Sequence, residues 1–520
     1  MTRPIEKWSS LPPSQQIQIL PASEPIGRRV ALGAAWMITL RITLRLVGLT
    51  STLVLVRLLA PQDFGLVAMA SVAYGMLDSL SESSFQLALI QMKAPEPRHY
   101  DSVWTLGVLR GATIAVIMAL CAPLVAAGMN EPRIQLLIYV LAISPIIQGF
   151  ENVTLVKWQR DLRFDRVFWY QVFSKITGSC AVVCAAIAFE NYWALIVAPL
   201  IVRAVMVPLS YYLSPYSPRF TTSAWRELFH FSKWLMVSNI LTMVEAYSIV
   251  FLIGRFFGPR SLGLFQMAME IAHLPASEVA APIRQPMYVG FVKVMDQTDA
   301  LRRQALEGLG LVLMLVVPLS VGLAVTADLV TPIFLGSKWT NATPIIAIGA
   351  LAALIDNIGY FTHNLYIVRH AQARFAVILG VMQVVRMALA IPIGAAYGIV
   401  GVAVVILVTS MLNCFTWFMG LSSLLRVKLS DLLRVSWRIT TSAIVMAIGV
   451  RGLSLLWPYS GTLFNQASHL AVACFTGAVL YSSVLVALWM ACGQPPGSEA
   501  DVFHNIHLFL TRLRHIRSRE

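Results

Sequence analysis

The residues of this sequence best suited to chemistry are charged side chains inside long apolar runs. Arg203 lies near the middle of one run, and neither that run nor the one before it contains an acid. Glu245 lies deep in another run, and Glu270 and His273 follow at helical spacing in the next. An arginine offers phosphate oxygens a planar pair of donors, and a desolvated carboxyl group can take up and release a proton. These four residues are therefore candidates for binding an anion and for coupling to a cation.

Other charges inside the apolar runs are expected to form pairs. Arg45 and Asp78 lie 16 residues before and 17 residues after Pro61, and Arg41 and Glu82 lie 20 before and 21 after it. At about 1.5 Å per residue, the members of each pair share a depth if the chain turns at Pro61. Pairing lowers the cost of holding such groups in lipid. Either pair could also line a cavity.

Asp356 and Arg386 are each 15 residues from Ala371, so they are predicted to form a structural pair within the membrane. The candidate residues for binding an anionic substrate are Arg203, Arg45, Arg41 and Arg284. The candidate residues for ion coupling are Glu245, Glu270, Asp78, Glu82 and His273. Four charges near the ends of the runs are instead expected to snorkel to the interface, namely Arg110, Lys175, Arg255 and Arg451.

The composition requires that these runs lie in lipid. Hydrophobic residues make up 58% of the 520 residues and charged residues only 12%, which is roughly half the charge of a soluble domain. The mean hydropathy is +0.72. One aqueous core cannot bury so many apolar side chains, so we expect an all-α polytopic membrane protein. The net charge of +14 resides mostly in short connections, which favours orientation determinants over nucleic-acid binding.

Fourteen apolar stretches are long enough to cross a bilayer as helices. They span about 33–59, 64–90, 103–128, 134–156, 168–189, 192–213, 230–257, 262–292, 308–331, 341–367, 373–396, 399–422, 436–457 and 467–491. Pro275, Pro282 and Pro286 predict that the eighth of these helices is broken.

The distribution of Lys and Arg predicts the orientation. One set of alternate connections, which includes both tails, carries 24 of the 39 basic residues, and the other set carries 4. Basic residues are retained in the cytoplasm, so both termini are expected there. The expected parts are a flexible cytoplasmic tail (1–32), an N-lobe of six helices (33–213), a cytoplasmic linker (214–229), a C-lobe of six helices (230–422), two extra helices (423–491) and a basic amphipathic tail (492–520).

The chain also contains an internal repeat. A shift of 198 residues superposes Arg57, Pro61 and Gly65 on Arg255, Pro259 and Gly263. Six predicted spans separate the two copies, so both copies have the same orientation. Parallel repeats are typical of transporters, whose substrate site lies between the two halves. The alternative is a common solution for a tight turn, since Pro and Gly recur at turns. The six cysteines are scattered and are interpreted as small buried hydrophobes, and no metal or cofactor is expected.

Three segments of the sequence resemble a known family. The segment LLAPQDFGLVAM (58–69) and the segment LALIQ (87–91) resemble the first hairpin of the polysaccharide-transporter branch of the MOP superfamily. The segment KWQRDLRF (157–164) is similar to the cytoplasmic linker that follows the fourth helix in that branch. The resemblance implies two six-helix lobes around a central cavity, two extra helices, and alternating access without an ATPase.

The resemblance and the intramembrane charges together lead to a functional hypothesis. Members of the branch are flippases for lipid-linked O-antigen and exopolysaccharide units, so the expected cargo is an undecaprenyl-pyrophosphate-linked oligosaccharide in a bacterial cytoplasmic (inner) membrane. Polysaccharide polymerase or export proteins are candidate partners, and a monomer is expected. The alternatives are a multidrug or small-cation antiporter of the same superfamily and a membrane-embedded glycan polymerase. Short outward connections disfavour a polymerase, and the lack of a G-x-x-x-x-G-K-[ST] loop disfavours a primary pump.

Overall fold

The structure is a computed structural model, and it describes residues 26–81, 89, 90, 92, 95–369, 371–456, 462–495 and 500. Most of the predicted amphipathic tail, most of the N-terminal tail and Glu82 lie outside the described residues. The side chain of Arg284 also lies outside this description.

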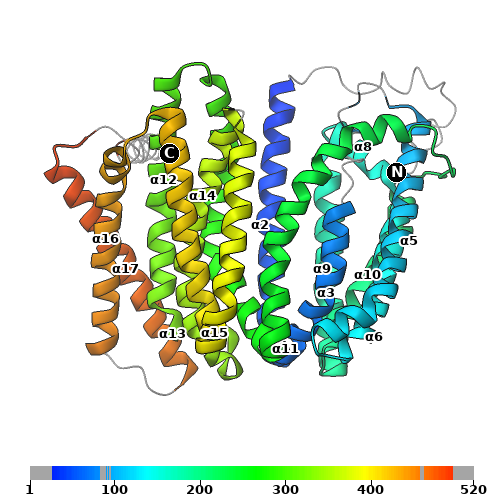
Figure 1. Ribbon diagram of the computed structural model, residues 1–520, viewed down its shortest axis with the longest axis horizontal. Coiled ribbons are helices and arrows are strands. Elements are labelled where there is room, and N and C mark those ends of the chain that lie inside the picture. The colour runs from blue at the N-terminus through cyan, green and yellow to red at the C-terminus, as the bar shows by residue number, and fades with distance from the viewer. Residues whose placement is uncertain are drawn as a thin grey trace, which may run out of the picture.

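The described chain is built from helices and contains no strand in these residues. The first group comprises α2 (Ile26–Leu58), α3 (Pro61–Ser81), α5 (Pro97–Gly128), α6 (Arg133–Leu141), α7 (Ile143–Gly149), η1 (Val153–Leu155), α8 (Val156–Arg160), α9 (Phe164–Phe189) and α10 (Trp193–Leu213). The second group comprises α11 (Trp225–Lys293), α12 (Thr298–Val325), α13 (Ala327–Val330), η2 (Thr331–Leu335), η3 (Ser337–Ala342), α14 (Thr343–Val368), α15 (Gln372–Leu425), α16 (Leu429–Leu456) and α17 (Leu463–Ala491). Figure 1 shows α3, α5, α6, α9 and α10 on one side and α12 and α14–α17 on the other, with α2 between them.

The expectation of an all-α polytopic membrane protein is confirmed. Within the described residues, ten helices are long and apolar enough to cross a membrane, or eleven if a bent pair counts as one span. The two longest helices each turn at a glycine with positive φ, at Gly258 (76°) in α11 and at Gly398 (66°) in α15. Both glycines lie where the sequence predicts a turn between two spans. The total of fourteen spans stays a prediction.

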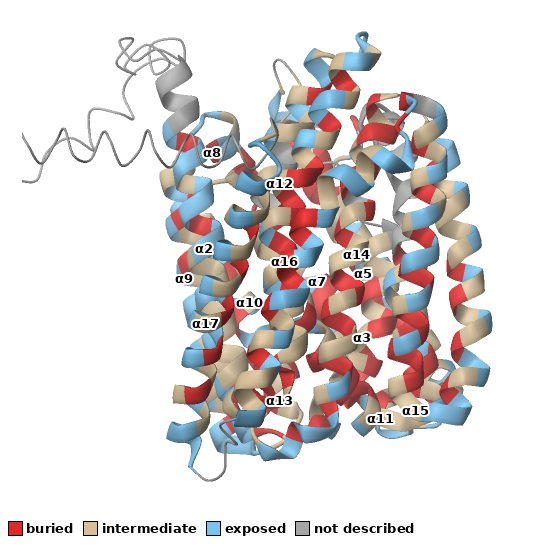
Figure 2. Ribbon diagram, turned by 90° about the vertical axis from the view of Figure 1, so that its left-hand side faces the viewer, coloured by how far each residue is buried: buried red, intermediate tan, exposed pale blue. Residues whose placement is uncertain are grey.

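The outer surface of this helical assembly is apolar. Large hydrophobic side chains point outward along it, including Leu120 (70% exposed), Leu124 (72%) and Phe475 (73%). Figure 2 shows exposed residues along the whole length of outer helices such as α17. A surface of this kind is stable in hydrocarbon and not in water.

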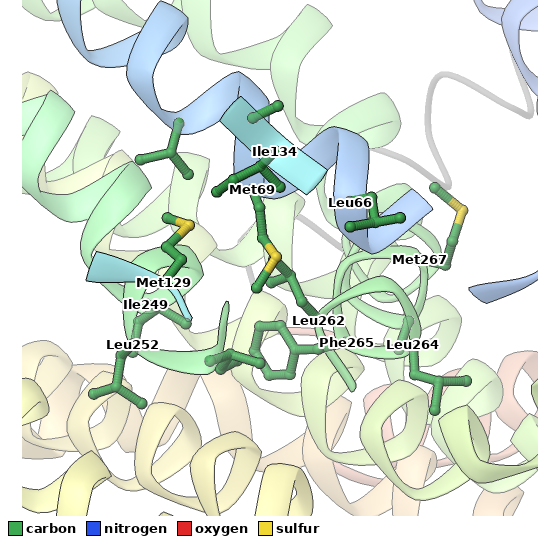
Figure 3. Packing of buried hydrophobic residues seen from close by; sticks show 14 of the residues in the cluster. Leu66, Met69, Met129, Ile134, Ile249, Leu252, Leu262, Leu264, Phe265 and Met267 are labelled. Carbon is green, nitrogen blue, oxygen red and sulfur yellow. The ribbon is translucent and has the colours of Figure 1, made fainter. Parts of the chain in front are cut away.

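The two copies of the repeated turn pack against each other. A Cβ atom on Gly65 would overlap the carbonyl oxygen of Pro259, and a Cβ atom on Gly263 would overlap the carbonyl oxygen of Pro61. This reciprocal contact is what a two-fold relation between the copies produces, and it explains why each copy needs a glycine. Buried residues from α3, α6 and α11, among them Met69, close the core at this end (Figure 3). We call this region the Pro61–Pro259 end.

The arginines of the repeat have separate environments. Arg57 donates to the carbonyl oxygen of Ile333 in η2, and the indole of Trp339 in η3 donates to the carbonyl oxygen of Val56 at 3.0 Å. The segment after α12 is therefore tied to the end of α2. Arg255 carries a buried guanidinium nitrogen for which the described residues provide no hydrogen-bond partner.

The linker between α10 and α11 is held against α5. Tyr216 donates to the carboxylate of Asp101 at 2.5 Å, and the backbone amide of Thr221 donates to the Thr105 hydroxyl at 3.0 Å. Burial and the hydrogen bond to Asp101 raise the pKa of Tyr216 above its ordinary value. The linker thus fixes the start of α11 relative to the first group of helices.

The Gly65→Ala and Gly263→Ala variants are each expected to lower the free energy of unfolding by about 1–3 kcal/mol, because the added methyl group meets a backbone carbonyl that cannot move away. Unfolding midpoints of the purified variants in detergent test this. Gly380→Ala is the matched control, since a Cβ atom there would meet nothing within 4 Å. Equal midpoints for all three variants would contradict the reciprocal contact.

Candidate functional site

The break in the helical framework lies in the fourth span and not in the eighth. The α11 arm that carries Pro275, Pro282 and Pro286 runs without interruption to Lys293, so the predicted break there is wrong. In a membrane, neighbouring helices can satisfy the backbone groups that a proline frees. The helix that does break ends at Gly149, and the segments Arg133–Gly149 and Val153–Arg160 meet at 59°.

Asn152 organises this break. Its side-chain oxygen accepts from the amide of Thr154 at 2.9 Å, and its side-chain nitrogen donates to the carbonyl oxygens of Ser210 and Ser214, at 3.0 and 2.7 Å. The Tyr211 hydroxyl donates to the carbonyl oxygen of Phe150 at 3.0 Å. Side chains therefore replace the hydrogen bonds that the helix gives up, which is the condition for non-helical backbone at this depth.

The broken span forms one wall of a cavity of about 860 Å³. The other walls are α2, α9 and α10, and Glu270 reaches the cavity from α11. Cavities of this size accommodate drug-sized ligands or headgroups. Its polar lining includes Ser51, Thr52, Gln148, Glu151, Asn152, Gln159, Tyr170, Gln171, Ser174 and Ser179.

The cavity carries more cationic than acidic side chains. Arg45, Lys175 and Arg203 line it, together with Glu151 and Glu270. Arg203 donates to the hydroxyl of Ser144, which orients its guanidinium from α10 toward α7. The structure thus brings together three of the sequence-predicted residues, Arg203, Arg45 and Glu270.

Two members of the predicted set, Arg45 and Asp78, have partners different from those expected. Asp78 pairs with Arg110 of α5, and Arg45 pairs with Glu278 of α11, with Nε and Oε1 3.2 Å apart. The predicted Arg45–Asp78 pair is therefore wrong. Distance from a turn fixes the depth of a residue but not the direction in which its side chain points. Arg41 is exposed on α2 and is not part of the cavity lining.

A second polar cluster lies among the helices of the second group. Glu245 lies within electrostatic range of Arg386 and Asp356, and His273 lies within range of Asp356. Arg386 is only 7% exposed, and its Nε donates to the Thr409 hydroxyl at 3.0 Å. Asp356 and Arg386, predicted to form a structural pair, lie within electrostatic range of each other but form no ion pair within 4.0 Å, and both belong to a larger cluster that also holds Glu245 and His273. We call these four residues the C-terminal cluster.

Sequence reasoning missed two residues of the cavity. Lys175 was expected to snorkel, yet it lines the cavity from α9. Glu151, for which the sequence predicts no role, lies in the break. The neighbouring Gly149 and Asn152 were the available signal, because a glycine and a side-chain cap beside an acid disfavour an uninterrupted helix. In the part of the chain described here, no three His, Cys, Asp or Glu side chains are grouped to hold a metal ion.

The comparison with protein families agrees with this architecture. A family model described as "Polysaccharide biosynthesis protein" matches residues 54–344, which is more than half of the chain. The chain belongs to this polysaccharide biosynthesis protein family.

Two relatives of this chain have names that refer to glycan biosynthesis. The chain is 23% identical over 336 residues to the lipopolysaccharide biosynthesis protein WzxC of Escherichia coli (strain K12), a match that covers 63% of this chain and 67% of that protein. It is 23% identical over 301 residues to the succinoglycan biosynthesis transport protein ExoT of Rhizobium meliloti (strain 1021), over 58% of this chain and 61% of that protein.

Solved structures show the fold. The chain superposes on the lipid II flippase MurJ in an inward closed conformation with a TM-score of 0.67 and 14% identity, over 89% of this chain and 99% of that one. An inward-facing MATE family transporter of the MOP superfamily gives a TM-score of 0.51 and 13% identity, over 78% and 99%. The MOP-type fold is therefore confirmed.

Replacing Arg386 with methionine is expected to lower the free energy of unfolding by about 3–5 kcal/mol, because two nearby carboxylates lose a buried cation. Adding Asp356→Asn to that variant should recover part of the loss, since one of the uncompensated charges is then removed. Denaturation midpoints of the purified single and double variants measure both effects.

The matched control for this experiment is Arg451→Met. Arg451 is 60% exposed in its pair with Asp328, so its replacement should cost less than about 1 kcal/mol. If Asp356→Asn made Arg386→Met less stable, the C-terminal cluster would not be held by charge compensation.

Proposed function

We propose that this protein is a flippase that moves an undecaprenyl-pyrophosphate-linked oligosaccharide across a bacterial cytoplasmic membrane by alternating access. The single observation that carries the proposal is the cavity lined by Arg45, Lys175 and Arg203 in a chain of this family. A pyrophosphate group requires cationic donors at membrane depth, whereas a polyprenyl tail is apolar and stays dissolved in the hydrocarbon of the bilayer. The protein therefore has to provide a polar route for the headgroup alone.

The chemistry of the lining supports an anionic cargo over a cationic drug. Three cationic side chains face two acids in the described lining, and the guanidinium of Arg203 can present two parallel donors to phosphate oxygens. The amides of Gln148, Gln159 and Gln171 and the ring of Trp158 suit sugar hydroxyls and sugar faces. A site for a lipophilic cation would show the opposite balance of charge.

The names of the relatives support the same reading. WzxC is named as a lipopolysaccharide biosynthesis protein, ExoT as a succinoglycan biosynthesis transport protein, and MurJ as a lipid II flippase. The excess of Lys and Arg in the connections that include both tails supports a cytoplasmic position for both termini. Proteins that polymerise or export the glycan are the expected partners, and the monomer is the expected unit.

Alternating access needs contacts between the lobes that form and break. The reciprocal Gly65 and Gly263 contact closes the Pro61–Pro259 end, and the Arg45–Glu278 pair joins α2 to α11 beside the cavity. The C-terminal cluster, with Glu245 and His273, is the proposed site for coupling to a cation. Opening the Pro61–Pro259 end while the opposite end closes would expose the cavity to the outer leaflet.

The Arg203→Ala variant is expected to lose most transport, because the headgroup loses its bidentate donor at the cavity wall. The loss of a hydrogen bond to a charged group costs about 1.5–3 kcal/mol, or roughly 10–100-fold in binding. The measurement is movement of a fluorescent polyprenyl-pyrophosphoryl oligosaccharide between leaflets of vesicles that contain the purified protein.

Arg451→Ala serves as the matched control, since that arginine lies in α16 away from the cavity. Its transport rate should stay at the level of the unaltered protein. Full transport by Arg203→Ala at equal reconstitution would contradict the assigned anion site. Export of cationic drugs without any effect of lipid-linked sugars would favour the antiporter instead.

A further inference from the structure

The carboxylate of Glu151, in the break of the fourth span, has no hydrogen bond or ion pair with any of the described residues. Asn152 and Thr154 are hydrogen-bonded, and the carbonyl oxygen of Phe150 accepts from Tyr211. Tyr211 in turn accepts from the indole of Trp104 at 2.8 Å. Within the described part of the chain, the carboxylate of Glu151 receives no such contact, and Glu151 lines the cavity. An arrangement that satisfies every neighbour but leaves a carboxylate open is typical of a binding site and not of a structural pair.

The nearest cation to this carboxylate is not in contact with it. Arg203 lies within electrostatic range of Glu151, but its guanidinium donates to Ser144, and the two charged groups form no ion pair within 4.0 Å. Both side chains line the same cavity. The guanidinium therefore has donors left to offer, and the carboxylate competes for them with any other anion that enters.

Other titratable groups surround Glu151 from each neighbouring helix. Tyr170 of α9 and Tyr211 of α10 lie within electrostatic range of the carboxylate. Arg110 of α5 lines a smaller cavity of about 70 Å³ that shares Glu151 and Gln148 with the large one, and it pairs with Asp78. Arg45 and Lys175 lie across the large cavity with Glu270, and Arg45 is engaged by Glu278. Arg203 is thus the cation that Glu151 and an entering anion share most directly.

We propose that Glu151 is an internal counter-anion of Arg203, which an entering pyrophosphate headgroup displaces while Glu151 takes up a proton. A pyrophosphate that is esterified at both ends carries two charges and no group that titrates near neutral pH. The guanidinium stays charged throughout. Binding of the headgroup next to Glu151 adds negative charge, so the carboxylate binds its proton more tightly when the site is filled. By linkage, a proton on Glu151 must then strengthen headgroup binding to the same extent.

This inference rests on the proposed function. It adds to that function one residue, Glu151, and the direction in which headgroup binding changes with pH. Headgroup binding is favoured at low pH, where Glu151 is protonated, and weakens as the pH rises, because the ionised carboxylate then competes with the headgroup for Arg203. Deprotonation therefore promotes release of the headgroup. Glu151 can respond to the headgroup in this way because the break in the fourth span places its carboxylate in the cavity wall.

The test is direct binding of geranylgeranyl-pyrophosphoryl-N-acetylglucosamine to the purified full-length protein in detergent between pH 6 and pH 8. The unaltered protein should bind more weakly as the pH rises, by up to about tenfold per pH unit where one proton is linked. Glu151→Gln should bind with no dependence on pH, and at pH 8 it should bind more tightly than the unaltered protein. Glu151→Asp should regain the dependence.

Glu190→Gln is the matched control, because Glu190 is an exposed acid in the turn between α9 and α10 and does not line the cavity. It should keep the pH dependence of the unaltered protein. If Glu151→Gln also kept that dependence, the inference would be wrong and the proposed function would stand. If the unaltered protein bound no probe at any pH, the proposed function itself would be rejected. A folding defect is detected separately, as a lower unfolding midpoint of Glu151→Gln.

Discussion

The structure depends on one constraint, which is that a charge at the depth of the bilayer needs a partner or water. The protein meets it in three ways. Asp78 and Arg110 form a direct pair, the C-terminal cluster balances two acids against Arg386, and a cavity is lined by Arg45, Lys175 and Arg203 together with Glu151 and Glu270. A chain with this distribution of charge has a polar interior and an apolar, lipid-facing surface. Both are required to move a charged headgroup across the hydrocarbon core of a membrane.

Backbone geometry supports this division at two positions. At the Pro61–Pro259 end, glycines allow the two turns to approach so closely that the helices of both halves share one core. At the break in the fourth span, Asn152 and Tyr211 supply the hydrogen bonds that the helix loses. The first feature closes one end of the molecule, and the second opens a wall of the cavity. Both are departures from regular helices that neighbouring groups fully compensate.

The sequence was sufficient for the helices and for much of the site. Hydropathy located α9, α10 and α17 to within a few residues, and the repeat located the turns at Gly65 and Gly263. Prediction from the sequence failed where the rotation of a helix about its axis decides which way a side chain points. It also failed where a local hydrogen bond decides whether a helix continues. Counting residues from a turn could not show that Arg45 faces α11, and the number of prolines could not show that neighbours keep the eighth span helical. The break around Glu151 depends on contacts with α10, which is distant in sequence from the break.

The central claim is that the cavity beside Arg203 holds water within the membrane. Single cysteines in a chain without the six native ones test it most directly. Gln171 and Ser174 of α9 line the cavity, whereas Trp169 and Phe173 of the same helix point outward and are 64% and 55% exposed. A charged, membrane-impermeant thiol reagent should modify Gln171→Cys and Ser174→Cys but not Trp169→Cys or Phe173→Cys. Unreactive cavity positions, or equal reaction on both faces of α9, would contradict the account.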